Sequence, residues 1–342
     1  MSRRALNSLN PGPRLNYDDL LRRFGHVFKL NRPCIIGNSL DAMVSYLILS
    51  ESLGWTLAGI YAPPALYLAT ECEHQRLAAV SAGGAIRARN PVFVGITVCQ
   101  GGLHSVGKDL VHWAPDYPLP SDPSRNSALN PNLLRGVTRR TFHDRLPFGL
   151  ACFILCCMTY WGLLKTRRWA PSLASVLLYL DRGMQKGFRN PDCALRWVDW
   201  LASHTRLAHI PPFGSMFQGS DLRRTVEVFA DIAAHVRTSG VSPRSQSLPL
   251  RGPFAWKKLS GLVQWLQEAT GMRGRFDELF ACRRLVFAVH TECTIASPNS
   301  FRTLRIRRPF AYRFAGSGAR RLIHEYFSRR MPRSSAPLGI NE

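Results

Sequence analysis

Apolar and polar positions are patterned most clearly near the beginning of the chain. Residues 33–37 form a short apolar run that suits a buried strand, and residues 55–61 return to the same character. Residues 41–53 between them have the length and apolar positions of a helix. Asn38 and Ser39 precede it with side-chain oxygens that can accept the amide hydrogens of a first turn. Strand, helix and strand in this order predict a βαβ unit, and therefore a parallel sheet with helices on its faces.

The pattern predicts further elements along the chain. A second buried strand is expected over residues 92–98, and a loop of glycine and polar residues, 101–109, follows it. Ligands of parallel sheets bind at the carboxyl ends of the strands, where this loop would meet residues 38–41. Residues 114–132 form a long irregular connection, typical of a functional or mobile loop. The other expected elements are helices over residues 17–24, 66–88, 148–164, 171–181, 191–204, 222–237, 255–270 and 319–330, and strands over residues 285–290 and 303–314.

Changes in composition divide the chain into regions. Residues 1–25 predict a basic N-terminal arm that ends in a short helix, and residues 26–205 predict an α/β domain. Composition shifts at residues 205–220. Residues 206–330 then predict a C-terminal α+β domain, and residues 331–342 predict a disordered tail.

One apolar stretch raises the alternative of a membrane span. Residues 146–164 contain no charged side chain and are just long enough to cross ~30 Å of hydrocarbon at ~1.5 Å per residue. Pro147 and Gly149 belong to the turn before the helix, which shortens its helical part. Basic residues flank both ends, so the stretch has no inside–outside bias. A buried central helix is therefore favoured, and no membrane is expected as a partner.

The charge balance is the unusual feature of the composition. Lys and Arg total 45 against 22 acidic residues, a formal net charge of +23. Such a field attracts polyanions, nucleic acid first and an anionic membrane surface second. The basic residues recur in pairs along the whole chain, which suggests a broad basic groove or face. The alternative is a general preference for Arg that only aids solubility.

Nine cysteines occur without a CxxC pair, and most lie in apolar surroundings. An odd number without a regular framework argues against a disulfide scaffold and favours a reducing compartment. Residues 1–24 lack the apolar core of a secretory signal. A cytoplasmic location is therefore expected.

Residues 35–45, with the sequence Ile-Ile-Gly-Asn-Ser-Leu-Asp-Ala-Met-Val-Ser, carry a resemblance to a known family. They resemble the first motif of the DHH phosphoesterase superfamily, which includes single-strand exonucleases, oligonucleotide phosphodiesterases and a pyrophosphatase. That motif is an apolar strand, Asp-x-Asp, a small residue and a helix with an early Ser. Asp41 matches the second Asp, Ala42 the small residue and Ser45 the helix Ser. Ser39 stands where the first Asp would be.

The remaining motifs of the family are matched in order and in apolar context. Gly95 stands where the second motif has a metal-binding Asp. Lys108 and Asp109 stand where Asp-His-His is expected, and Asp181 keeps the ligand position that ends the fourth motif. The resemblance covers residues 28–205. It implies a doubly wound, mostly parallel sheet with helices on both faces, and a smaller C-terminal α+β domain that binds substrate or nucleic acid.

The family's chemistry is hydrolysis of phosphodiesters by two divalent ions, which needs about four or five carboxylate and His ligands. On this resemblance Asp41 and Asp181 are the surviving catalytic and metal-binding residues. Asp109 is a candidate replacement metal ligand and His104 a candidate catalytic one. Lys108 adds positive charge where a metal would lie. The implied cofactor is Mn²⁺ or Mg²⁺, or none, and the implied site is a phosphate-binding cleft that has lost part of its metal set.

Several residues are candidates for contact with phosphate or nucleic acid, because they are polar and lie at the expected cleft, alternate with aromatic residues, or form a glycine-rich loop. They are Asn38, Ser39, Lys108, Arg305, Arg307, Gly316 and Gly318.

Each candidate also has a purely structural interpretation. Asp41 lies where a carboxylate stabilises a helix N-terminus, and Asp181 could form a surface ion pair with Arg182. His104 could be an ordinary loop or core residue.

The sequence therefore leaves three hypotheses for function. The first is a nucleic-acid-handling protein of DHH type, which binds single-stranded DNA, RNA or oligonucleotides and has weakened or lost hydrolysis. The second is a non-catalytic basic scaffold subunit of a nucleic-acid-associated or other protein complex, and the third is a membrane-associated protein.

Overall fold

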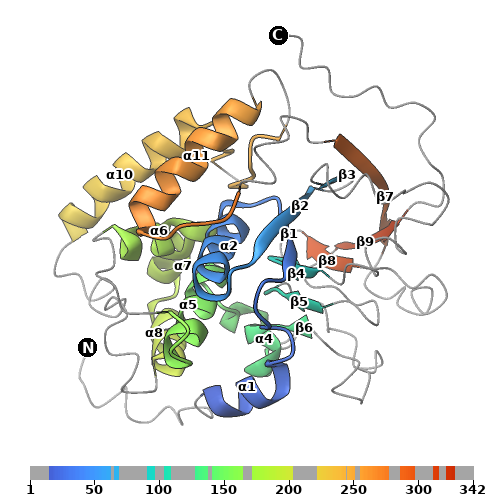
Figure 1. The fold of residues 1–342 in the computed structure, drawn as a ribbon. Coiled ribbons are helices and arrows are strands. Elements are labelled where there is room, and N and C mark those ends of the chain that lie inside the picture. Colours follow the sequence, from blue (N-terminus) through green and yellow to red (C-terminus); the bar gives the residue numbers. More distant parts are fainter. Residues whose placement is uncertain are drawn as a thin grey trace, which may run out of the picture.

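One nine-stranded sheet runs through the described part of the chain (Figure 1). The computed structural model describes residues 15–62, 65–68, 91–96, 104–108, 128–137, 141–164, 172–202, 222–243, 245–250, 255–276, 286–296, 311–315 and 321–327. The strands are β1 (Pro33–Gly37), β2 (Thr56–Ala62), β3 (Ala65–Leu68), β4 (Val92–Val94), β5 (His104–Val106), β6 (Ala128–Leu129), β7 (Val286–Ala296), β8 (Ala311–Ala315) and β9 (Arg321–Phe327). Their order across the sheet is β6-β5-β4-β1-β2-β3-β7-β9-β8.

The sheet has a parallel and an antiparallel part. β2, β1, β4, β5 and β6 pair in parallel with their neighbours. β3 turns back along β2, and from there β7, β9 and β8 continue the sheet in antiparallel pairs. The expectation of an α/β fold with a parallel sheet is confirmed.

Most of the described helices lie on one side of the strands (Figure 1). α2 (Leu40–Leu53) contacts β1 and β4, and α5 (Leu150–Tyr160) packs against α2. Both helices are apolar on nearly every face because they lie inside the molecule. The other helices are α1 (Tyr17–Phe24), α4 (Pro131–Leu134), α6 (Leu173–Tyr179), α7 (Gly183–Arg189), α8 (Pro191–Leu201), α10 (Leu222–Thr238) and α11 (Ala255–Thr270), with 3-10 turns at Phe142–Asp144 and Leu180–Arg182.

The apolar stretch that raised the membrane alternative contains α5, which is 11 residues long. Within the ranges that the structure describes, no helix combines the length and the apolar character needed to cross a bilayer.

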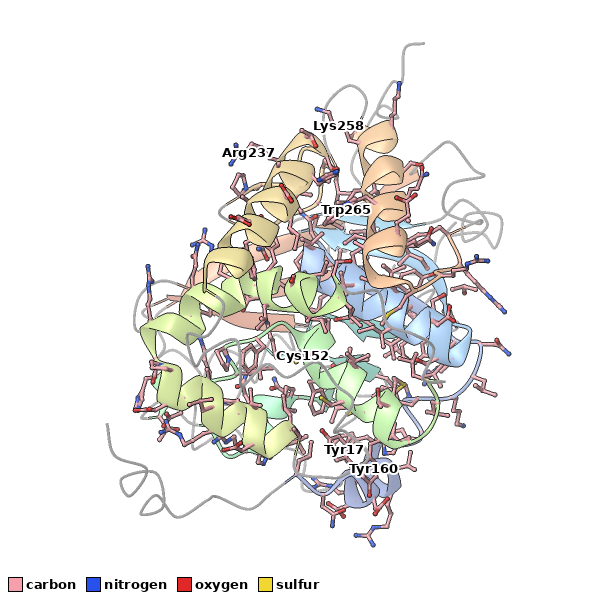
Figure 2. The ribbon with its side chains drawn as sticks, turned by 90° about the vertical axis from the view of Figure 1, so that its left-hand side faces the viewer. Tyr17, Cys152, Tyr160, Arg237, Lys258 and Trp265 are labelled. Carbon is pink, nitrogen blue, oxygen red and sulfur yellow. The ribbon has the colours of Figure 1, made fainter. Side chains whose placement is uncertain are left out.

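Local signals in the sequence set the ends of the first helices. Ser39 Oγ accepts a hydrogen bond from Ala42 N at 3.1 Å and so caps α2, while Gly54 ends that helix with a φ of 68°. α1 lies over residues 17–24, as the sequence predicts, and Asn16 caps it. Tyr17 stacks on Tyr160 with ring centroids 4.7 Å apart, and the two rings lie together in Figure 2. The helix within the predicted basic arm is therefore docked on the core.

Four elements differ from the sequence-based expectation. Strand β3 lies at the start of the predicted helix 66–88, β4 is shorter than the predicted strand 92–98, and the predicted loop 101–109 contains β5. Strand β9 replaces the predicted helix 319–330, because it pairs on both edges with β7 and β8. Strand pairing is a non-local interaction that overrides local helix propensity. The boundaries proposed for the domains stay predictions.

Gly95, which stands in the Asp position of the second motif, is required by packing. It follows β4 with a φ of 77°, a conformation that favours glycine. A Cβ atom at this position would lie 2.6 Å from the Cβ of Ala42. The close approach lets the first turn of α2 lie against the end of β4.

We expect Gly95→Ala to lower the free energy of unfolding by about 3 kcal/mol, because it combines an unfavourable φ with a clash in the core. Gly136→Ala is the matched control. Gly136 has a φ of 73°, but nothing lies within 4 Å of a Cβ built there. Its expected cost is about 1 kcal/mol, from the backbone alone. Urea unfolding measures both values, and equal losses would show that contact with Ala42 is unimportant.

Candidate functional site

Asp41 lies in the first turn of α2, at the carboxyl end of β1, and its side chain is only 8% exposed. Its Oδ2 accepts a hydrogen bond from Leu150 N at 2.8 Å, and its Oδ1 accepts one from Ala151 N at 3.1 Å. These amides open α5, whose own N-cap residue, Gly149, has no side chain to cap it. Asp41 therefore caps a helix that lies more than a hundred residues away in the chain, and it gains from the positive N-terminal ends of two helices.

Lys108 follows β5 and reaches the same end of the sheet. Its Nζ lies 3.3 Å from Asp41 Oδ2 and 2.7 Å from Asp181 Oδ2, and donates to Phe148 O at 3.1 Å. An ammonium group has three donors, so these three acceptors use all of them. Direct contact between Lys108 and a phosphate, which the sequence suggested, does not fit this geometry.

Asp181 lies in the 3-10 turn between α6 and α7 and is half-buried. It forms ion pairs with Lys108 and, by a short contact, with Lys186 of α7. Asp181 and Arg182 both adopt positive φ, at 50° and 57°. Such backbone persists only where the surroundings hold it. Here the side chain of Gln246 holds it: Oε1 accepts a hydrogen bond from Asp181 N at 2.6 Å, and Nε2 donates one to Tyr179 O at 2.9 Å.

These four side chains, Asp41, Lys108, Asp181 and Lys186, form what we call the charged cluster. Burial by itself would lower the pKa of Lys108, but the carboxylates of Asp181 and Asp41 outweigh it and raise that pKa. Burial would raise the pKa of Asp181, but Lys108 and Lys186 outweigh it and lower that pKa. The pKa of Lys186, in contrast, is lowered, because burial and repulsion from Lys108 outweigh the attraction of Asp181. The cluster is thus two carboxylates and two ammonium groups, in which the charged forms of Lys108 and Asp181 are stabilised by their partners.

The charged cluster does not fit a divalent metal ion. The ammonium of Lys108 bridges the Oδ2 atoms of Asp41 and Asp181, the two carboxylates that the resemblance assigns to metal binding. A divalent ion there would meet the positive charges of Lys108 and Lys186 at close range. The residues that the structure describes contain no group of three or more His, Cys, Asp or Glu side chains able to hold a metal. Asp109 lies outside the described residues.

His104 lies at the other end of the parallel strands. It is the first residue of β5, level with Val92 of β4, whereas Lys108 follows the last residue of β5. Its ring makes an edge contact with His26, with centroids 5.3 Å apart. The structure does not bring His104 to Asp41, so its assignment as a replacement catalytic residue does not fit the geometry.

The other candidates have structural contacts or lie outside the described residues. Asn38 Oδ1 accepts from Leu248 N at 3.0 Å, and Ser39 caps α2. The candidates outside the described residues are Arg305, Arg307, Gly316 and Gly318.

Sequence reasoning missed Lys186 and Gln246. Lys186 lies beyond the end of the fourth motif, and Gln246 lies in a segment rich in Ser and Pro. Neither position carries a local signal that would link it to Asp181.

We expect Lys108→Met to lower the free energy of unfolding by about 3 kcal/mol, because it leaves Asp41 buried and strips Asp181 of one partner. Lys186→Met should cost about 1 kcal/mol or less, since Asp181 keeps Lys108 and is partly exposed. Thermal and urea unfolding give the comparison. Equal costs would contradict a central role for Lys108.

The pH dependence of stability should report on His104. Burial, and then the charges of Arg32, His26 and Lys29, lower the pKa of His104 from 6.5 to about 4. The unfolded chain therefore binds a proton below about pH 6.5 that the folded chain resists until about pH 4, so stability is lost as the pH falls through that window. His104→Asn should make this acid loss smaller in urea unfolding. An unchanged pH profile would contradict the lowered pKa.

Comparisons with known proteins leave the family of this chain open. Searches against protein-family models, curated proteins and solved structures found no match. The charged cluster at the carboxyl end of the parallel strands is therefore interpreted from its own geometry and charge.

Proposed function

We propose that this protein binds single-stranded nucleic acid or oligonucleotides and does not hydrolyse them. It would be a relative of the DHH phosphoesterases in which metal-dependent cleavage has been lost. The proposal includes that family's doubly wound sheet with helices on both faces and its smaller C-terminal domain. Burial of the described free cysteines, which are Cys34, Cys152, Cys156, Cys157 and Cys193, supports a cytoplasmic place of action.

The observation that supports binding without cleavage is the position of Lys108 Nζ between Asp41 and Asp181. Two-metal hydrolysis needs the carboxylates to hold metal ions that generate hydroxide and stabilise the phosphate's charge. Here an ammonium group, with no open coordination position and a pKa raised further by its neighbours, takes the place of the cation. The carboxylates of the cluster are thus paired with ammonium groups, which supports binding without metal-dependent hydrolysis.

The net charge of +23 supports nucleic acid as the partner. One described surface suits this partner. Three basic side chains are exposed near one end of the α10–α11 pair: Arg237, Lys257 and Lys258. Figure 2 shows Arg237 and Lys258 near each other. On the same pair, His235 stacks on Trp265 with ring centroids 5.5 Å apart. Basic groups beside aromatic rings can contact phosphates and stack on bases.

Binding is tested by fluorescence anisotropy with a labelled single-stranded oligonucleotide. If several Lys and Arg residues contact phosphates, affinity should fall by about a thousandfold between about 50 and 200 mM salt. Lys257→Gln with Lys258→Gln should reduce the slope of log affinity against log salt by about 1.5. The control is Arg22→Gln with Arg23→Gln, an adjacent pair whose charges are partly neutralised by Asp19. A flat salt response would overturn nucleic acid as the partner and favour the scaffold hypothesis.

Cleavage is tested on the same oligonucleotides with added Mn²⁺. We expect no Mn²⁺-dependent product, and no heat of Mn²⁺ binding in calorimetry, because Lys108 fills the cation position. Metal-dependent cleavage by the purified chain that disappears in Asp181→Asn would overturn the assignment as a non-hydrolysing protein. Asp181 is the better choice for this control than Asp41, since loss of Asp41 would also uncap α5.

A further inference from the structure

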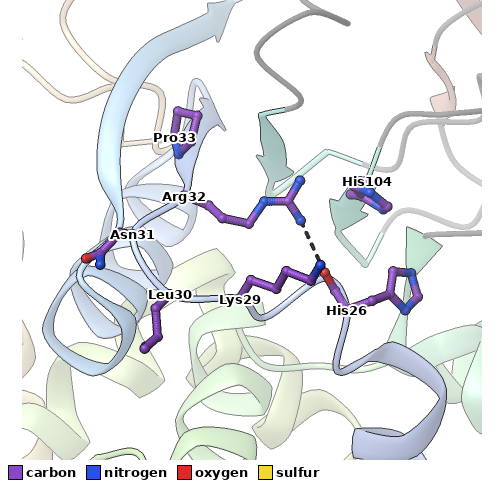
Figure 3. A pocket seen from close by; sticks show the side chains of 7 residues that line it. All are labelled: His26, Lys29, Leu30, Asn31, Arg32, Pro33 and His104. Carbon is purple, nitrogen blue, oxygen red and sulfur yellow. Dashed lines mark hydrogen bonds between the residues drawn. The ribbon is translucent and has the colours of Figure 1, made fainter.

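A positively charged site lies at the amino ends of the parallel strands, away from the charged cluster. It is a pocket of about 380 Å³ between the segment that follows α1 and the first residue of β5. We call it the amino-end pocket. Its lining residues are His26, Lys29, Leu30, Asn31, Arg32, Pro33 and His104 (Figure 3).

Hydrogen bonds fix the backbone that forms this pocket. Arg32 Nη1 donates to the carbonyl oxygens of His26 at 3.3 Å and Val27 at 3.4 Å, which closes the turn. Trp55 Nε1 donates to Lys29 O at 2.8 Å, and Asn31 N donates to Leu53 O at 2.8 Å. The segment that carries His26, Lys29 and Arg32 is therefore held against the end of α2 and the residue before β2.

The described lining of the amino-end pocket contains four basic residues and no acidic one. Figure 3 shows Arg32, the residue before β1, reaching toward the rings of His26 and His104. Burial is the first cause that lowers the pKa of His104, and repulsion from Arg32, His26 and Lys29 adds to it. Among the described residues, the charged groups that shift the pKa of His104 are therefore all basic. A positive potential held in a concave site is the arrangement that attracts a small anion.

One polar atom of the pocket lacks a hydrogen bond. His104 Nδ1 is shielded from solvent and has no hydrogen-bond partner among the described residues. A buried polar atom in this state costs free energy, which a hydrogen bond to a ligand oxygen would remove. Because the imidazole can change tautomer or turn about χ2, it can direct an N–H toward such an oxygen.

We propose that the amino-end pocket binds a phosphate group. The planar guanidinium of Arg32, the ammonium of Lys29 and two imidazoles supply directional and point-charge donors that match a tetrahedral oxyanion with several acceptor oxygens. The pocket has room for a phosphate and for a small group attached to it. The ligand is therefore a phosphate monoester, either a free phosphorylated small molecule or the terminal phosphate of a nucleic acid.

The first experiment is calorimetric titration of the full chain with inorganic phosphate, in a buffer free of other polyanions. Lys29→Gln should weaken binding by about tenfold, since it removes one charged contact. Lys29 is chosen over Arg32 because its side chain is exposed, whereas Arg32 also holds the turn. Arg189→Gln, which removes the same charge from an exposed position on α7, should change the affinity by less than about twofold.

A spectroscopic readout places the ligand directly. Phosphate should shift the imidazole proton resonances of His26 and His104, and His104→Asn should weaken binding while the chain stays folded. Absence of saturable binding up to about 10 mM phosphate would overturn the proposal. So would equal affinity of Lys29→Gln and the wild-type chain.

The two sources of phosphate are separated by oligonucleotides with and without a terminal phosphate. A preference for the phosphorylated form that inorganic phosphate abolishes, and that Lys29→Gln loses, assigns the pocket to nucleic-acid ends. Equal affinity for both forms, with inorganic phosphate still bound, assigns it to a small molecule. Because inorganic phosphate is the probe, loss of phosphate binding in the pocket can be observed while nucleic-acid binding at α10–α11 persists. Phosphate binding can likewise persist when nucleic-acid binding is absent.

Discussion

The carboxylate of Asp41 is the interaction on which the centre of the molecule depends. It accepts two amide hydrogens from the start of α5 and pairs with Lys108, while its own backbone begins α2 beside β1. Three segments far apart in sequence thus meet at one buried side chain. An unpaired carboxylate in such surroundings is costly, so its partners have to be supplied together. The apolar packing of α2 on α5 requires the same relative position of the two helices as the hydrogen bonds of Asp41 do. Polar and apolar interactions therefore favour the same arrangement.

The cluster around Asp41 satisfies two carboxylates with ammonium groups and leaves no position for a metal ion between them. Lys108 provides a fixed positive charge between two carboxylates, with three donors that satisfy three acceptors. A metal ion would add open coordination positions, through which water and phosphate react. The ammonium group offers none. In the function we propose, polyanions are recognised outside the cluster, by the basic surface on α10–α11 and by the amino-end pocket.

The sequence predicts the local part of this fold well. Helix α1 lies over the residues expected, and β1 and α2 follow the βαβ pattern, because caps and apolar periodicity are encoded within a few residues. The order of Asp41, Lys108 and Asp181 also marks the segments that converge. The sequence could not predict which residue each of these side chains contacts. Lys108 was expected to face phosphate and instead faces two carboxylates, and His104 lies at the opposite end of the strands. Long-range contacts also explain why β9 was predicted as a helix. It is a strand because it pairs with β7 and β8, which its own local sequence does not indicate.

Strand β3 joins the parallel and antiparallel parts of the sheet, and its second edge pairs with β7 through contacts such as Leu66 with Val289. During synthesis, β3 leaves the ribosome long before β7 exists. At typical elongation rates that edge waits on the order of ten seconds or more for its partner. An open strand edge is a template for pairing with other chains. The order in which this sheet is completed therefore leaves β3 as an open edge in the newly made chain, and a chaperone that covers this edge would act before the C-terminal strands are made.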